Sequence, residues 1–420
     1  MRLRVKFSTI LEQSIFLLIL SLVFLYDAFD NSLGFLDELF ALFSLLVLLY
    51  FIFIKQRMKL YRSEYYILSL LGIITIIGLL SNYHSYQNGN QTSGAAIFGD
   101  LVTFNKAFVS YIGVRLLSKY FNSNKVLNSI TKYIELIFYI LSFIIVLDFI
   151  FKFFPQPPRY GVYSFQLFFK HPSRFGFAFT FIFLALLPKY YKDRKSILVF
   201  VLLLGMLSLR VKYIGFGFLT VVFMFYGKRL FKIPKAYFLW IVVSLALIML
   251  WLFWDTFQMY FTFKSINTAW SRAIVLYYSF IIGNDFFPLG SGFGTYSSYY
   301  SGVYYSWVYD SYKISKVYGI SRIYPNFIAD QYWPMVLGQF GYFGLLCMVG
   351  IIYQYFKLFL TNIKFYVKSE KYYYFLSIIL GLLLLLVDST SDAIFSQQRG
   401  VVMFIYFALV VNTVDERHEK

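Results

Sequence analysis

Residues 36–54 read LDELFALFSLLVLLYFIFI, an apolar block long enough to cross a lipid bilayer as a single helix. The blocks LEQSIFLLILSLVFLY (residues 11–26) and YYFLSIILGLLLLLV (residues 373–387) are of the same kind. The chain of 420 residues is 60% hydrophobic and only 14% charged, against about 25% charged residues in ordinary soluble domains. Because no soluble core is large enough to bury so many apolar blocks, the sequence predicts an all-α, polytopic integral membrane protein.

The pattern predicts about twelve transmembrane helices. They are residues 8–26, 35–54, 65–81, 98–118, 133–153, 174–190, 196–209, 213–227, 236–254, 331–354, 372–388 and 396–413. The pair within 196–227 is either two short helices or one broken helix. The chain thus divides into helices 1–9 (residues 1–254), a large extracytoplasmic loop with interfacial helices (255–330), and helices 10–12 with a cytoplasmic tail (331–420).

The loop charges predict the orientation. With a cytoplasmic N terminus, the inside segments hold 24 of the 38 basic residues, so both termini are expected inside. The net charge of +18 then reflects topology and attraction to anionic lipids, and no nucleic acid is expected as a partner. MRLRVK precedes a first helix without a small-residue cleavage site, which favours a retained helix over a signal peptide. Cys347 is the only cysteine, so an intrachain disulfide is excluded.

The positive charges on the predicted outer side are unevenly placed. The loops at 27–38 and 82–97 have none, whereas the later outer segments carry Arg159, Lys170, Arg174, Arg210, Lys212, Lys264, Arg272, Lys313, Lys316, Arg322 and Arg399. Outer positive charge opposes the insertion rule, so we expect an anionic ligand to account for it. Phosphates are the obvious anions at a membrane surface, and arginine binds them well. Anchoring at the interface, snorkelling, and pairing of Arg322 with Asp310 or Asp330 are the alternatives.

The large loop is rich in tyrosine and tryptophan, which suit the membrane interface and also stack on sugar rings. It begins with a predicted short interfacial helix in SRAIVLYYSFIIGND, followed by PLGSGFGTY (residues 288–296). Gly290, Gly292 and Gly294 form G-x-G-x-G, which differs from a dinucleotide fingerprint and has no room for a βαβ unit. These glycines are instead expected to shape a tight loop beside the anion site, or simply to form a tight turn.

Several motifs follow one another along the chain. They are FFKHPSRFGF (168–177), SLRVKYIGFGF (208–218), R-x3-L at Arg272–Leu276, D-x-x-P-L-G-x-G-x-G-T-Y (285–296), and Asp330 with Gly341 eleven residues later. Together with the topology, this order resembles the bacterial O-antigen polymerase/ligase family, and SLRVKYIGFGF is similar to a stretch of Wzy-type capsular polysaccharide polymerases. The ligase branch has His where this chain has Asp330, so the polymerase branch is the better match.

The resemblance implies a glycosyltransferase in the bacterial cytoplasmic membrane. Its substrates would be oligosaccharide repeat units linked to undecaprenyl pyrophosphate, with a flippase and a chain-length regulator as further partners and no cofactor or metal. Arg272 would be catalytic, and Asp330 would serve as base, although Asp330 is also a plausible helix N-cap. Arg159, His171, Arg174, Arg210, Lys212 and Arg322 would bind the pyrophosphate. An O-antigen ligase and a lipid-oligosaccharide flippase or transporter remain the alternatives; buried charges in the membrane, such as Asp100 and Lys106, are compatible with a transporter.

Overall fold

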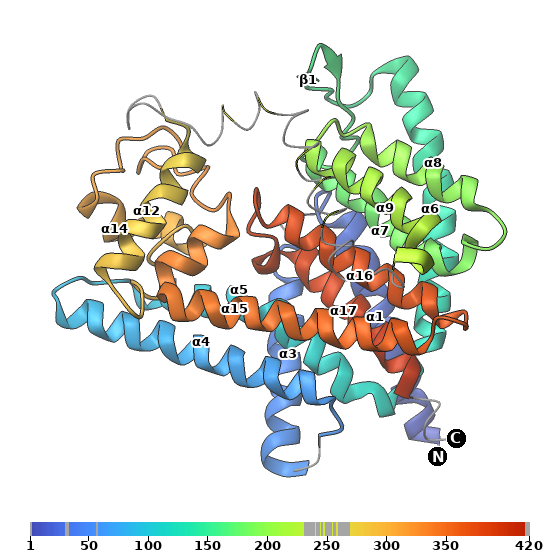
Figure 1. Cartoon of the computed structure of the whole chain (residues 1–420), viewed down its shortest axis with the longest axis horizontal. Helices are drawn as coiled ribbons and strands as arrows, with labels where there is room; N and C mark the ends of the chain where they lie inside the picture. The colour runs from blue at the N-terminus through green and yellow to red at the C-terminus, as the bar shows by residue number, and fades with distance from the viewer. Residues whose placement is uncertain are drawn as a thin grey trace.

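The computed structural model describes residues 2–29, 33–55, 58–230 and 269–415, together with a few single positions between 240 and 258. Regular structure in these residues is helical apart from one short antiparallel hairpin, β1 (Pro158–Arg159) with β2 (Val162–Tyr163) (Figure 1). The longer helices are α1 (Arg2–Leu20), α3 (Leu36–Tyr50), α4 (Arg62–Gln87), α5 (Gly94–Leu116), α6 (Ser123–Phe151), α7 (Pro172–Tyr190), α8 (Lys195–Met206), α9 (Val211–Leu230), α12 (Ser271–Asp285), α15 (Tyr332–Phe365), α16 (Lys371–Asp388) and α17 (Gln398–Asp415).

Eleven of the twelve predicted segments coincide with helices, and the ninth, 236–254, lies outside the described residues. Residues 196–227 form two helices, α8 and α9, rather than one broken helix. Among the described residues, six helices are long and apolar enough to cross a membrane. These are Phe7–Leu25, Leu36–Lys55, Arg62–Gln87, Ser123–Phe151, Tyr332–Phe365 and Lys371–Asp388. The chain is therefore an all-α protein of membrane-spanning character.

Helices α4 and α15 lie side by side along much of their length (Figure 1). Helix α4 begins where Glu64 folds back, so that its carboxylate accepts the backbone N–H of Tyr61 at 2.7 Å. Helix α15 is interrupted at Gly341, whose φ of +62° and ψ of −166° are not helical. Since a positive φ suits glycine best, Gly341 is where the helix can change direction without side-chain strain.

Residues 271–330 form a compact unit at one end of α15. It contains α12 and two single-turn helices, α13 (Tyr299–Val303) and α14 (Trp307–Ser311). A small core of its own holds it together, formed by Ile274, Val275, Ile282, Tyr296, Val308, Tyr309, Ile314, Val317, Ile320 and Ile328. The predicted interfacial helix at the start of this region corresponds to α12, which packs against α15 (Figure 1).

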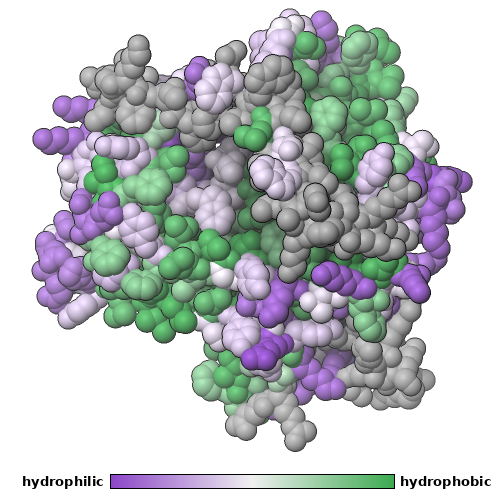
Figure 2. Space-filling view, in the orientation of Figure 1, coloured by the Kyte–Doolittle hydropathy of each residue, from purple (hydrophilic) through white to green (hydrophobic). Residues whose placement is uncertain are grey.

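Several contacts join loops and helix ends that are far apart in the sequence. Segments predicted for the outer side touch one another at Asp27 with Arg174, Phe165 with Leu207, and Thr92 with Trp307. Glu12, near the start of the first predicted segment (8–26), pairs with Lys125, and Lys192 pairs with Glu370 between two segments predicted for the inner side. Figure 2 shows apolar side chains over much of the visible face, with hydrophilic ones at the left and right margins and in a group near the lower centre. The helices thus place polar loops at two opposite ends of an apolar bundle.

Candidate anion-binding site

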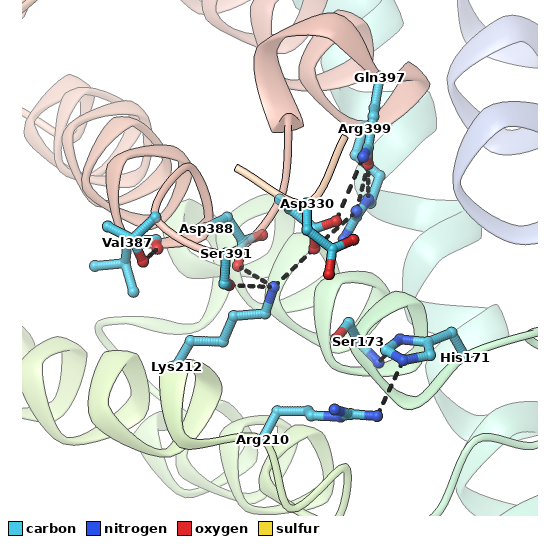
Figure 3. Close-up of polar contacts among 12 residues, drawn as sticks. His171, Ser173, Arg210, Lys212, Asp330, Val387, Asp388, Ser391, Gln397 and Arg399 are labelled. Atoms are coloured by element: carbon cyan, nitrogen blue, oxygen red, sulfur yellow. Dashed lines mark hydrogen bonds and ion pairs between the residues drawn. The ribbon is translucent and has the colours of Figure 1, made fainter. Parts of the chain in front are cut away.

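Ionisable side chains from distant parts of the sequence meet beside the ends of α7, α9, α15, α16 and α17. Figure 3 shows Lys212 pointing toward Asp388, and Arg210 pointing toward His171, with Asp330 and Arg399 close by. The ionisable side chains are those of His171, Arg210, Lys212, Asp330, Asp388, Asp392 and Arg399. Four of these seven residues lie within a few residues of a helix end, and the other three lie in the first or last turn of a helix, so the packing of the bundle brings them together. We call this set the charge centre.

Lys212 pairs with two carboxylates of the charge centre. Its Nζ atom lies 2.9 Å from Oδ2 of Asp392 and 3.1 Å from Oδ1 of Asp388. Arg399 lies on the other side of Asp392, with Nη2 3.2 Å from the same Oδ2 atom. The hydroxyl of Tyr213 donates to Oδ2 of Asp388 at 3.2 Å. Burial alone would raise the pKa of Asp392, but the positive charges of Arg399 and Lys212 outweigh burial and hold that pKa far below its usual range.

His171 and Arg210 form the side of the charge centre nearest α7. His171 caps α7, because its Nδ1 atom accepts the backbone N–H of Ser173 at 3.1 Å. Its Nε2 atom lies 3.0 Å from Nη2 of Arg210. Burial and the charge on Arg210 lower the pKa of His171 to about 4. His171 is therefore uncharged near neutral pH and acts as a neutral polar neighbour of the cations.

Arg272 and Asp330 form the side of the site contributed by residues 271–330. Nη2 of Arg272, in the first turn of α12, donates to Oδ2 of Asp330 at 3.2 Å, and the two side chains are 24% and 29% exposed. Burial raises the pKa of Asp330, while Arg272 and Lys212 oppose the shift. The N-cap position of α15 is taken by Gln331 rather than Asp330, which leaves the Asp330 carboxylate turned to Arg272.

Three further residues of the predicted anion set lie in other contacts. Arg174 forms an ion pair with Asp27. Arg322 pairs with Asp310 at 3.2 Å, and both side chains are more than half exposed. Arg159 belongs to the β1–β2 hairpin, with its guanidinium 5.3 Å from the ring centre of Tyr160. The charge centre thus brings together His171, Arg210, Lys212 and Asp330, whereas these three arginines have partners of their own.

The glycine stretch PLGSGFGTY packs closely against three helices. Gly290, Gly292 and Gly294 have φ values of +84°, +102° and +73°. A Cβ atom at each position would overlap neighbouring backbone: Gly341 N at 2.4 Å for Gly290, Asn82 N at 2.7 Å for Gly292, and Ala96 C at 2.8 Å for Gly294. The three neighbours belong to α15, α4 and α5. Glycine is therefore required both for the backbone conformation and for the close approach.

Hydrogen bonds fix the same stretch to the bundle. The side-chain amide of Asn82 donates to the carbonyl of Phe293 at 2.9 Å and accepts its N–H at 2.8 Å. Asp100 accepts the N–H of Gly294 at 2.8 Å and also the Nε2–H of Gln339 at 2.8 Å. Asp100, a buried charge that is compatible with a transporter on sequence grounds, is here a structural acceptor.

The end of the stretch supports the catalytic candidates. The hydroxyl of Tyr296 donates to the carbonyl of Val275 in α12 at 2.7 Å. Oγ of Ser297 donates to the carbonyl of Ile328 at 3.1 Å. Arg272 lies one turn before Val275, and Asp330 lies two residues after Ile328. The glycine stretch therefore positions both members of the Arg272–Asp330 pair without facing the charge centre itself.

Sequence reasoning left Asp388, Asp392 and Arg399 out of the candidate set. In the structure, Asp392 pairs with both Arg399 and Lys212. The sequence does not show that Lys212 in α9 is the partner of these aspartates, because the proximity of Lys212 to the loop before α17 depends on helix packing. The one sequence signal for these residues was the clustering of charged side chains at the ends of two apolar helices.

Within the described ranges, no group of three or more His, Cys, Asp or Glu side chains is arranged to hold a metal ion. No protein-family model matches the sequence, and neither the curated proteins nor the solved structures include a significant match to it. The geometry of the charge centre and of the Arg272–Asp330 pair is therefore the basis for assigning a function.

Proposed function

We propose that the chain is a membrane-embedded polysaccharide polymerase that joins oligosaccharide repeat units carried on undecaprenyl pyrophosphate. The observation that carries the proposal is the meeting of Arg272 and Lys212 at Asp330, with Arg399 on Asp392 and Arg210 on His171 in the same charge centre. Burying cations such as Lys212 and Arg399 at the end of a membrane-spanning bundle is costly, so their retention favours a functional role. A lipid diphosphate is the anion that a bilayer delivers to that position.

In the proposed reaction, a hydroxyl of the acceptor sugar attacks the anomeric carbon of the donor glycan. The hydroxyl proton passes to the Asp330 carboxylate as the new C–O bond forms. The bond between the anomeric carbon and the diphosphate oxygen breaks, and the diphosphate leaves with its negative charge increased by one. Cations that meet this developing charge lower the barrier, which is the role proposed for Arg272 and the charge centre. Since burial raises the pKa of Asp330, its carboxylate is a better proton acceptor than an exposed one.

The finer topology belongs to the same proposal. Twelve spans would place both termini in the cytoplasm of a bacterial cell and the charge centre on the outer face of the cytoplasmic membrane. The unit at 271–330 would form the large outer loop between spans nine and ten, where exposed tyrosines face the glycan. A flippase would deliver the lipid-linked units, and a chain-length regulator would act on the product. The diphosphate bond supplies the free energy, so no nucleotide cofactor takes part.

The test is deletion of the gene followed by gel analysis of the surface glycan and of the lipid-linked precursors. A polymerase deletion removes high-mass polymer and leaves single lipid-linked units on the outer face. Complementation with Arg272→Gln should fail, whereas Lys192→Gln, which changes an exposed lysine at the opposite polar end, should restore polymer. Accumulation of units on the cytoplasmic side would instead identify a flippase, and polymer that stays on its lipid carrier would identify a ligase.

A further inference from the structure

Lys212 and Arg399 share a single oxygen atom of Asp392. Lys212 Nζ lies 2.9 Å and Arg399 Nη2 lies 3.2 Å from Oδ2, and both cationic side chains are almost fully buried, with exposures of 12% and 6%. An oxygen held between an ammonium and a guanidinium is also the arrangement in which proteins bind a phosphate oxygen. The Asp392 carboxylate therefore occupies a place that fits an external oxyanion.

Arg399 retains a donor that the protein does not use. Its Nε and Nη2 atoms donate to Oε1 of Gln397, while Nη1 is buried and has no hydrogen-bond partner among the described residues. A buried donor without a partner is destabilising, and more so when it is charged, so its retention calls for a ligand. Figure 3 shows Arg399 reaching into the space near Asp330.

The local charges leave room for an anion. Arg210, Lys212, Arg272 and Arg399 contribute four positive charges, against three negative charges from Asp330, Asp388 and Asp392. His171 adds no charge near neutral pH, because burial lowers its pKa to about 4. The net local charge is thus +1 with Asp392 in place and +2 once its carboxylate is displaced.

We propose that Lys212 and Arg399 form a seat for a diphosphate and that Asp392 is the internal counter-anion which the diphosphate displaces. An incoming anion must bind strongly enough to offset the loss of two ion pairs. Common weakly bound anions do not meet this threshold, whereas a diphosphate, with two or more charges and several oxygens, does. The returning carboxylate then helps to expel the product, which is more negative than the donor. This inference deepens the proposed function and rests on it for the lipid-linked identity of the ligand, but the seat itself requires only a diphosphate.

Binding of inorganic pyrophosphate to the purified full-length chain in detergent, measured by calorimetry, tests the seat. Asp392→Asn should increase the affinity at least tenfold and should make inorganic phosphate bind measurably, because displacement no longer opposes either anion. The double variant Arg399→Gln, Asp392→Asn keeps the local charge balanced and should lose that gain. Lys192→Gln, at the opposite polar end, is the matched control and should behave as the unmodified chain.

An unchanged pyrophosphate affinity in Asp392→Asn would overturn the inference, as would a double variant that binds as tightly as Asp392→Asn. Farnesyl diphosphate distinguishes the sources of the ligand: tighter binding than pyrophosphate indicates a lipid-linked diphosphate, and equal binding indicates a soluble one, with the seat supported in both cases. The deletion phenotype separates the two proposals. If the deletion strain makes normal polymer but Asp392→Asn binds pyrophosphate more tightly, the polymerase proposal is refuted and the seat is supported. If the deletion removes the polymer but Asp392→Asn leaves the pyrophosphate affinity unchanged, only the seat is refuted.

Discussion

In the proposed reaction, the Arg272–Asp330 pair combines two chemical roles at a distance of 3.2 Å. The guanidinium is placed to meet negative charge, and the carboxylate is placed to accept a proton. Their environments act in opposite directions on Asp330: burial raises its pKa, and Arg272 lowers it. The pair therefore sets the pH at which the carboxylate becomes available as a base.

Replacing Arg272 by Gln should reduce polymerisation about 100-fold, the usual effect of removing one group that stabilises a developing oxyanion. The residual activity should also shift in its pH dependence. Asp330 acts when ionised, so activity falls as pH drops through its pKa. Without Arg272 that pKa rises further, and the acid limb of the profile should move to higher pH. Polymer formation in proteoliposomes at a series of pH values measures both effects; an acid limb that stays in place would rule out Asp330 as the base.

The sequence identified this pair through its motif positions but left open whether Asp330 merely caps a helix. A cap and a base differ in where the carboxylate points, and that depends on the segment before α15. Ser297 and Tyr296 hold that segment and α12 in position. These hydrogen bonds span 21 and 31 residues, a separation over which periodicity and composition carry no information.

At the scale of elements, the glycine stretch joins α12 to α4, α5 and α15. Each of its glycines meets a different helix, so the stretch is a junction rather than a mobile loop. The motif itself predicted a tight backbone, and the φ values agree. Which helices it would join was not predictable, because hydropathy shows that a helix exists but not its neighbours.

Gly292→Ala should destabilise the protein by about 3 kcal/mol, since it combines an unfavourable positive φ with overlap against α4. Gly302→Ala, in α13, is the matched control. Its Cβ atom would have no neighbour closer than 3.5 Å, and alanine favours helix, so no loss is expected. Thermal unfolding in detergent compares the two; equal stabilities would show that the junction tolerates side chains.

Helix existence was easier to predict than helix length. The hydropathy pattern predicts helices at 65–81, 133–153 and 331–354. The corresponding helices α4, α6 and α15 run over Arg62–Gln87, Ser123–Phe151 and Tyr332–Phe365. The added turns are polar, as in SNKVLNSITK at the start of α6. A hydropathy window ends where the apolar residues end, but backbone hydrogen bonding continues into the polar zone.

At the scale of the whole molecule, the loops gather at two opposite polar ends. Cys347 is the only natural cysteine, so a Cys347→Ser chain allows single engineered cysteines to report topology. Asn88→Cys should react with a membrane-impermeant maleimide in intact cells, whereas Asp193→Cys should react only after permeabilisation. Both positions are exposed, so equal access to reagent is expected once the membrane is opened. Labelling in the opposite order would invert the orientation and remove the charge centre from the outer face.

The end opposite the charge centre is held by a buried ion pair. Arg115 in α5 and Glu64 in α4 are 1% and 0% exposed, and Arg115 also donates to Asn412 in α17. Arg115→Met leaves the Glu64 carboxylate buried without its cation and should cost about 3–5 kcal/mol. Adding Glu64→Gln removes that charge while keeping an acceptor for the Tyr111 hydroxyl, so much of the loss should be recovered. Unfolding of the single and double variants checks this; additive losses would contradict it.

The order in which the charge centre is synthesised has a consequence for biogenesis. Arg210 and Lys212 enter the membrane with α9, long before the ribosome reaches Asp388, Asp392 and Arg399. Until α16 and α17 are inserted, Arg210 and Lys212 lack the carboxylates of Asp388 and Asp392, and the charge centre is incomplete. A product truncated before α16 therefore carries unneutralised positive charge, and the proposed glycan transfer requires a chain that extends through Arg399.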